Sequence, residues 1–199
     1  MELAAWAIGA VIALIMCIPL FLTYIAVYVL EGIAFTKLSK IKPVKNMCLV
    51  WIPSYVEYIG KKYIMSQFSD EADYHIFGRS IVFKNRLTPF WIYFVLQIVI
   101  LAMSLIVSLL GAIPILGIIL FVIYLVISVP SMVVLTIIEY GYFRDMLNYF
   151  RPGNTGNVTT AVLVTIANIV TNRLVGAIYL IVLSKKASNV VVLDAEEEI

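Results

Sequence analysis

An arginine in the middle of an apolar segment is the side chain of this sequence best placed to do chemistry. Arg173 lies between Val158 and Leu183, a run of 26 residues that has no other charged side chain. Burying an arginine at the bilayer centre costs from about 3 to more than 10 kcal/mol, so such a residue usually faces a bundle interior or a water-filled cavity. We therefore expect Arg173 to serve either a substrate or ion path or the packing of the bundle.

Polar side chains recur at helical spacing around this arginine, and again in the segment 90–110. Two such stripes could line a hydrated path through a membrane protein. They could equally donate the hydrogen bonds that hold neighbouring membrane helices together. The residues assigned to the candidate path are Arg173, Asn172, Asn168, Thr165 and Gln97.

A nucleophile and a base are also present, in Cys48 and the single histidine, His75. Small membrane cysteine peptidases of similar length place the histidine shortly before the cysteine, whereas here it follows by 27 residues. Asp70 and Asp73 lie near His75, but on a helix these side chains point in different directions. We therefore assign no catalytic residue, metal site or cofactor, and an enzyme is the less favoured hypothesis.

The longest uncharged stretch decides the class of protein. Leu87–Ile138 is 52 residues without a charged side chain. One helix of that length would extend ~78 Å, against a hydrocarbon core of about 30 Å. The turn Gly111-Ala112-Ile113-Pro114 divides it into two spans. With 63% hydrophobic residues, the chain is expected to be an all-α membrane protein, a single bundle with approximate spans 3–30, 90–110, 115–139 and 158–183.

The distribution of charge orients these four spans. Nine of the 14 Lys and Arg residues fall between Glu31 and Pro89, so the loop 31–89 is expected to be cytoplasmic and the N-terminus outside. Within this loop, a helix is expected from Asp70 to Phe77. The aromatic and basic segment before it, which includes Trp51 and Lys62, is too short to cross a membrane and is typical of an interfacial or re-entrant helix. Its membrane-interface residues are expected to be Trp51, Tyr55, Tyr58, Lys61 and Lys62.

Small residues recur at every fourth position of the first span. Such a stripe lets a second helix approach closely, which matters because lipid supplies no hydrophobic drive for helix association. Besides the lipid bilayer, we expect another membrane subunit or a second copy of this chain as the partner, and nothing indicates nucleic acid. The packing residues are Ala5, Gly9, Ala13 and Cys17.

One segment resembles part of a known group of proteins. The pattern Lys45-Asn46-x-x-Leu49-x-Trp51-Ile52-Pro53, with its tail from Tyr58 to Lys61, is similar to small, uncharacterised polytopic membrane proteins of Gram-positive bacteria. The closing stretch Val158–Lys186 is similar to that group too. The resemblance implies a bacterial plasma membrane and brings no established activity.

Two topologies are open for the last apolar segment. As one helix, Val158–Leu183 would be ~39 Å long and could cross, which would place Lys185 and the C-terminus outside. As a re-entrant hairpin with Arg173 at its tip, it would leave Lys185 inside, as the charge rule prefers. A continuous helix satisfies its own backbone hydrogen bonds, so we expect the crossing.

Three functions are consistent with these features. The first is a non-catalytic multi-pass subunit that acts as partner, scaffold or accessory of a larger membrane complex. The alternative is a small oligomeric channel or transporter subunit that uses Arg173 and the polar face of the last span. The third is a membrane-embedded enzyme of the cysteine peptidase type.

Overall fold

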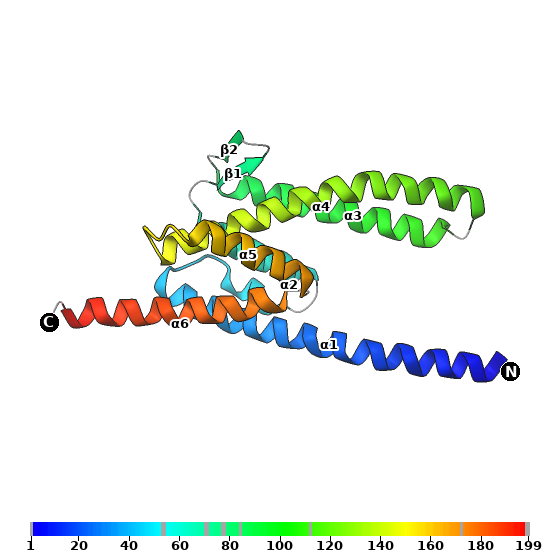
Figure 1. The fold of residues 1–199 in the computed structure, drawn as a ribbon, viewed down its shortest axis with the longest axis horizontal. Coiled ribbons are helices and arrows are strands. Elements are labelled where there is room, and N and C mark those ends of the chain that lie inside the picture. Colours follow the sequence, from blue (N-terminus) through cyan, green and yellow to red (C-terminus); the bar gives the residue numbers. More distant parts are fainter. Residues whose placement is uncertain are drawn as a thin grey trace. The chain divides into compact units, whose positions relative to one another are not determined.

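The structure is a computed structural model that describes residues 2–52, 55–69, 72–76, 79–83, 85–111, 113–171 and 173–197. Within these ranges the chain is helical apart from one β-hairpin and the connecting turns (Figure 1). In chain order the elements are α1 (Glu2–Ile41), the 3-10 helix η1 (Met47–Trp51), α2 (Tyr55–Ser66), β1 (Ala72–Ile76), β2 (Arg79–Phe83), α3 (Leu87–Leu110), α4 (Pro114–Phe150), α5 (Asn157–Val170) and α6 (Leu174–Glu197).

Three of the described helices are long and apolar enough to cross a membrane. They are Cys17–Ile41 within α1, the whole of α3, and Ile115–Phe150 within α4. The expectation of a helical chain with helices that could cross a membrane is therefore confirmed for three of the described helices, and not for the four spans expected. Helix α5 is apolar but has only 14 residues, about 21 Å of helix, which is shorter than a hydrocarbon core of about 30 Å.

The single helix expected over 158–183 is wrong. Helix α5 ends at Val170, and α6 begins at Leu174 after a turn. Arg173 has φ 75°, a left-handed backbone conformation that an α-helix of L-residues does not continue through. The polar residues that the sequence analysis placed on one helical stripe therefore belong to two helices and the turn between them.

The helix expected from Asp70 to Phe77 is also wrong. Asp70, Glu71 and Phe77 lie outside the described residues, and the described part between them is strand β1. It pairs antiparallel with β2, with Tyr74 opposite Ile81 and His75 opposite Ser80. Aromatic and β-branched side chains are frequent in these ten residues, and such residues favour strands over helices.

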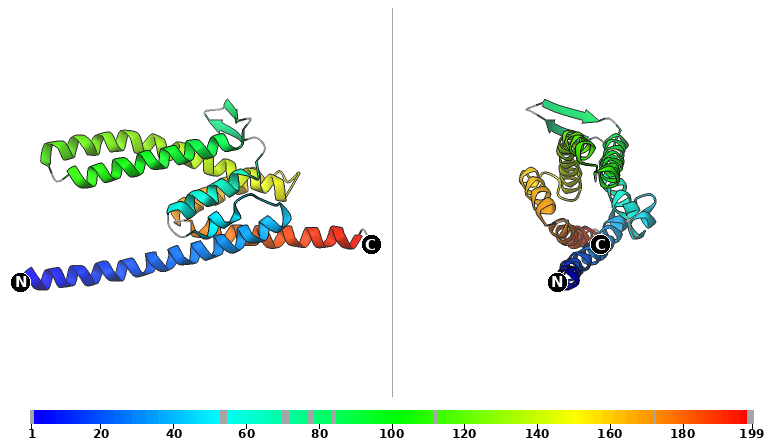
Figure 2. Two further views of the ribbon diagram at one scale, coloured as in Figure 1. Left: turned by 180° about the vertical axis from the view of Figure 1, so that it is seen from behind. Right: turned by 90° about the vertical axis from the view of Figure 1, so that its right-hand side faces the viewer.

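The chain divides into two compact units, which we describe separately. Unit 1 contains the described residues up to Pro43 and those from Ile166 onward. Its helices α1 and α6 run side by side in the same direction, so the N- and C-termini lie at its opposite ends (Figures 1 and 2). Its buried side chains come from the second half of α1 and the first half of α6: Val27, Ala34, Phe35, Leu38, Ala177, Leu180 and Leu183.

Unit 2, residues 44–165, has a packed end and a long apolar hairpin. At the packed end, α2, the start of α3 and the second half of α4 bury large side chains such as Ile64, Tyr93 and Met146. Beyond Phe94, the hairpin of α3 and α4 exposes apolar side chains on both helices. The 20 residues from Trp91 to Leu110 make about 30 Å of helix, the thickness of a hydrocarbon core.

Candidate functional site

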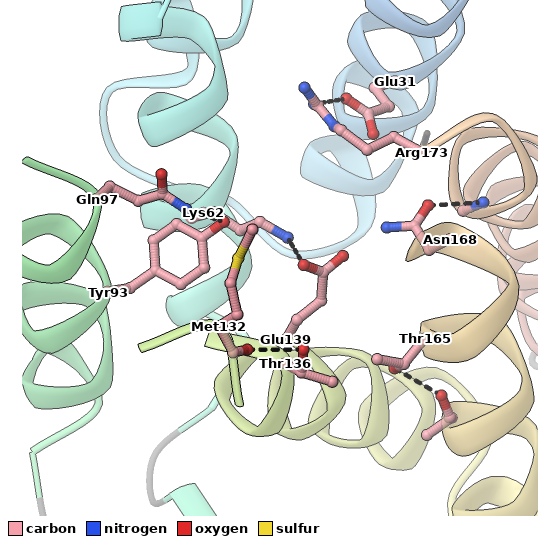
Figure 3. A network of polar contacts seen from close by, with 12 residues as sticks. Glu31, Lys62, Tyr93, Gln97, Met132, Thr136, Glu139, Thr165, Asn168 and Arg173 are labelled. Atoms are coloured by element: carbon pink, nitrogen blue, oxygen red, sulfur yellow. Dashed lines mark hydrogen bonds and ion pairs between the residues drawn. The ribbon is translucent and has the colours of Figure 1, made fainter. Parts of the chain in front are cut away.

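In unit 1, Arg173 forms an ion pair with a carboxylate of helix α1. Its Nη2 donates to Oε2 of Glu31 at 2.5 Å (Figure 3). The Glu31 side chain is 8% exposed and that of Arg173 is 21% exposed. The turn before α6 thus brings the guanidinium of Arg173 back onto α1, and the pair joins α1 to the start of α6.

The polar neighbours of Arg173 cap the start of α6, the helix that follows the turn. Asn168 Oδ1 accepts from the backbone N–H of Gly176 at 3.0 Å, and Thr171 Oγ1 accepts from the N–H of Val175 at 3.1 Å. These N–H groups belong to the first turn of α6, where no intrahelical acceptor is available. Asn168 therefore acts as a helix cap that reaches across from α5 (Figure 3).

Gly176 allows this cap to form. A Cβ at position 176 would lie 2.1 Å from Asn168 Oδ1, closer than any real non-bonded contact. The remaining members of the expected stripe behave differently. Thr165 donates its hydroxyl to Ala161 O within α5 at 2.8 Å, and Asn172 lies outside the described residues.

Gln97, the other residue assigned to a candidate path, lies in unit 2. Its Nε2 donates to the hydroxyl of Tyr93, one turn earlier on α3, at 3.5 Å. This Tyr93 ring also lies beneath the ammonium group of Lys62, with 5.6 Å between Nζ and the ring centroid. Gln97 is therefore the outer member of a polar cluster at the packed end of unit 2.

The centre of that cluster is a buried ion pair that the sequence analysis missed. Lys62 Nζ on α2 lies 3.1 Å from Glu139 Oε2 on α4, and the two side chains are 6% and 11% exposed. Glu139 is the first charged residue after the uncharged stretch that forms most of α3 and α4, which was the available signal. The position of α2, the helix that carries Lys62, could not be predicted from the sequence.

A second group of charges lies further along α4. Arg144 donates from Nη2 to Asp145 Oδ1 at 2.9 Å, and Ser69 after α2 donates its hydroxyl to the other carboxylate oxygen. The guanidinium of Arg144 lies 5.8 Å from the ring centroid of Tyr140. The hydrogen bond from Ser69 to Asp145 holds the segment after α2 against the end of α4.

The residues expected at the membrane interface have different positions in the structure. Trp51 is exposed, but Lys61 and Lys62 are buried inside unit 2. Tyr55 and Tyr58 lie on α2, and the surroundings of their side chains are outside the described part. The reason for the burial of Lys62 is Glu139, which compensates its charge and allows the lysine side of α2 to pack inward.

The structure gives few contacts for the remaining residues singled out in the sequence, which are the two cysteines, His75 and the small residues of α1. Cys17 and Cys48 are free and exposed thiols. His75 pairs through its backbone with Ser80, and its side chain is outside the described part. The same holds for the side chains of Ala5, Gly9 and Ala13 on α1. Within the described residues, no three histidine, cysteine or acidic side chains lie together as a metal site.

Comparisons with known proteins give no relative for this chain. No protein-family model, no curated protein and no solved structure matches it.

Proposed function

We propose that this protein is a non-catalytic subunit of a larger membrane complex, in which it acts as partner, scaffold or accessory. The observation that supports this function is that buried charged side chains form ion pairs between helices. The pair Lys62–Glu139 joins α2 to α4, and the pair Glu31–Arg173 joins α1 to the start of α6. Charges committed to holding helices together stabilise a fixed shape, as a scaffold requires.

The exposed surface supports the same proposal. Apolar side chains are exposed along α1 between Ile15 and Ile33, and along the hairpin of α3 and α4. Lipid covers such surfaces in a bilayer, and other membrane subunits can cover them too. The resemblance to polytopic proteins of Gram-positive bacteria supports a bacterial plasma membrane as the location of this complex.

The proposed topology has three crossings and a cytoplasmic C-terminus. Helix α5 is too short to cross, and α6 starts beside Glu31 and runs in the same direction as α1. If α1 leads from the outside to the cytoplasm, α6 then continues into the cytoplasm. This reverses the C-terminal position expected from a continuous last span, and it keeps Lys185 and Lys186 on the side that the charge rule prefers.

A pair of reporters tests this topology. Fused after Ile199, a reporter active only in the cytoplasm should be active, and one active only outside should be silent. Fusions within 111–113, the turn between α3 and α4, provide the control and should give the opposite result. An externally active fusion after Ile199 would reject the three-crossing topology.

Purification in mild detergent and chemical cross-linking in native membranes together test the subunit function. After purification, the chain should elute with a stoichiometric partner or as a homo-oligomer, with one defined molar mass measured by light scattering. The same species should be cross-linked before solubilisation, which excludes association in the micelle. A monodisperse monomer in both measurements would reject the proposal.

A second function, a small oligomeric channel or transporter subunit, is favoured by the conformation of Arg173. This residue combines a left-handed φ with a partly exposed guanidinium, and strained backbone is concentrated at functional sites. Vesicles that contain the protein should then conduct an anion, and Arg173→Ala should change the selectivity. Unchanged flux in that variant would remove Arg173 from any conduction path.

A further inference from the structure

On helix α1, one outward row of side chains changes from apolar residues to lysines. The row proceeds in helical steps of three or four residues from Val29 and Ile33, which are exposed, to Lys37 and Lys40. Lys37 is half-buried and Lys40 is exposed. Lys40 is also the last residue but one of the candidate span Cys17–Ile41, so the lysines begin where this helix would leave the hydrocarbon of a bilayer.

Helix α6 shows the same change on an outward row of its own. Ile178 and Val182 are exposed apolar side chains one turn apart. Lys185 and Lys186 follow at the next turn, and both are exposed. Because burying an ammonium group in hydrocarbon is costly, lysines on an otherwise apolar helix mark the level at which it reaches the headgroups.

The lysines of the two helices lie at nearly the same level of unit 1. Glu31 contacts Arg173, and α1 and α6 run side by side in the same direction (Figure 2). Counted from this pair, Lys40 comes nine residues later on α1 and Lys185 twelve residues later on α6. At 1.5 Å per residue, these levels are about 14 and 18 Å from the pair, about one helical turn apart. We call this set of side chains the lysine belt: Lys37, Lys40, Lys185 and Lys186.

The charges of the lysine belt are not used inside the fold. Among the residues that the structure describes, none of these four lysines forms an ion pair or a side-chain hydrogen bond. They differ in this from Lys62, which is paired with Glu139. The carboxylate of Glu31 on α1 is already paired with Arg173. The belt therefore has positive charge that the described part of unit 1 does not compensate.

The apolar surface next to the belt favours a phospholipid over other anionic partners. A phospholipid offers a phosphate group together with acyl chains, which can cover Ile33 and Val182 at the adjacent level. A soluble anion would leave these side chains uncovered, and an acidic protein would first have to displace the headgroups from both helices. Each lysine near a membrane surface raises the affinity for anionic headgroups about fivefold.

We propose that the lysine belt binds the headgroups of anionic phospholipids in the leaflet where α1 and α6 leave the membrane. Under the topology proposed above this is the cytoplasmic leaflet, and the reporter fused after Ile199 tests that assignment separately. The binding surface itself depends neither on this topology nor on the subunit function, because all of its residues belong to unit 1.

Native mass spectrometry of the full-length protein in mild detergent tests the belt. Phosphatidylglycerol and phosphatidylcholine with identical acyl chains are titrated in separate experiments, and the bound lipids are counted at each concentration. Phosphatidylglycerol should bind more tightly. Lys185→Gln/Lys186→Gln should weaken its binding about 25-fold, which is about fivefold for each lysine, and should leave the binding of phosphatidylcholine unchanged. Inorganic phosphate at the same concentration as the lipid should not displace it.

Two further variants provide the matched comparison. Lys185→Arg/Lys186→Arg keeps both positive charges and should bind phosphatidylglycerol as the parent does. Lys40→Gln changes the other helix and should weaken the binding about fivefold. All three positions have exposed side chains, so the fold should be retained, and parent-like binding of phosphatidylcholine verifies this.

Several results would overturn the proposal. Equal affinities of the parent for the two lipids would mean that the headgroup is not recognised. Unchanged binding of phosphatidylglycerol in both Lys185→Gln/Lys186→Gln and Lys40→Gln would leave the belt to another partner, such as an acidic protein. An equal loss in the arginine and glutamine variants would exclude charge as the cause. Displacement of the lipid by inorganic phosphate would indicate a site for soluble anions.

Discussion

Replacing Lys62 by methionine removes the positive charge from a pair whose Nζ and Oε2 atoms are 3.1 Å apart and whose side chains are almost fully buried. At an effective dielectric constant of about 20, the attraction at this distance is about 5 kcal/mol. Removing one partner also leaves the charge of the other buried and uncompensated, and breaking buried pairs in this way typically costs about 3–5 kcal/mol. Lys62→Met is therefore expected to lower the free energy of unfolding by about 3–4 kcal/mol, within the range for broken buried pairs.

Replacing both partners should have a much smaller effect. In Lys62→Met/Glu139→Met, neither charge of this pair remains, and two apolar side chains of similar volume pack in its place. Such apolar replacements of buried pairs are often neutral or stabilising. The double variant is therefore expected within about 1 kcal/mol of the parent, and so it should be more stable than either single variant.

Reversible unfolding by SDS in mixed micelles, followed by tryptophan fluorescence, measures these free energies. Lys45→Met is the matched control, because the Lys45 side chain is exposed, and it should change stability by less than about 0.5 kcal/mol. If the effects of Lys62→Met and Glu139→Met simply add in the double variant, the two side chains are not coupled. That result would refute the role of this pair in holding α2 on α4.

Three further changes test the other polar contacts. Gly176→Ala should displace the Asn168 side chain from its cap and cost about 1–2 kcal/mol in the same SDS titration, and a parent-like value would contradict the close approach. Glu31→Gln should cost less than a fully buried pair, about 1–2 kcal/mol, because its arginine partner is partly exposed, and it should speed tryptic cleavage of α6. Ser69→Ala removes a hydrogen bond to the Asp145 carboxylate and should cost about 1.5–3 kcal/mol; no change by SDS titration would show that water replaces the hydroxyl.

The helices most easily predicted from the sequence were those that contain little except apolar residues. The uncharged stretch and its Gly-Pro turn predicted α3 and α4 as a hairpin, because length and hydropathy suffice for that inference. Helix α4 continues past Pro130 and ends at Phe150, immediately before Arg151-Pro152. In these elements, local composition alone decides the structure.

The errors arose where side chains interact over a turn or over long separations. The break between α5 and α6 at Thr171–Arg173 depends on hydrogen bonds to the side chains of Asn168 and Thr171, which cap α6. A hydropathy average over many residues does not detect such individual contacts. The pair Lys62–Glu139 joins residues far apart in sequence, and only the position of α2 on α4 brings them together. The two basic residues of α2, Lys61 and Lys62, therefore looked like a membrane-surface signal, although both are buried.

The pairing of Glu31 with Arg173 also affects how the protein is made. These two residues are 142 positions apart, so at about 5–20 residues per second the glutamate leaves the ribosome roughly 7–30 s before its partner. During that interval the second half of α1 has neither the ion pair nor the apolar surface of α6. A chain that stops early would expose an unpaired carboxylate and an uncovered helix face, both of which membrane proteases and chaperones can recognise. Helix α1 therefore becomes stably assembled only after α6 has been made.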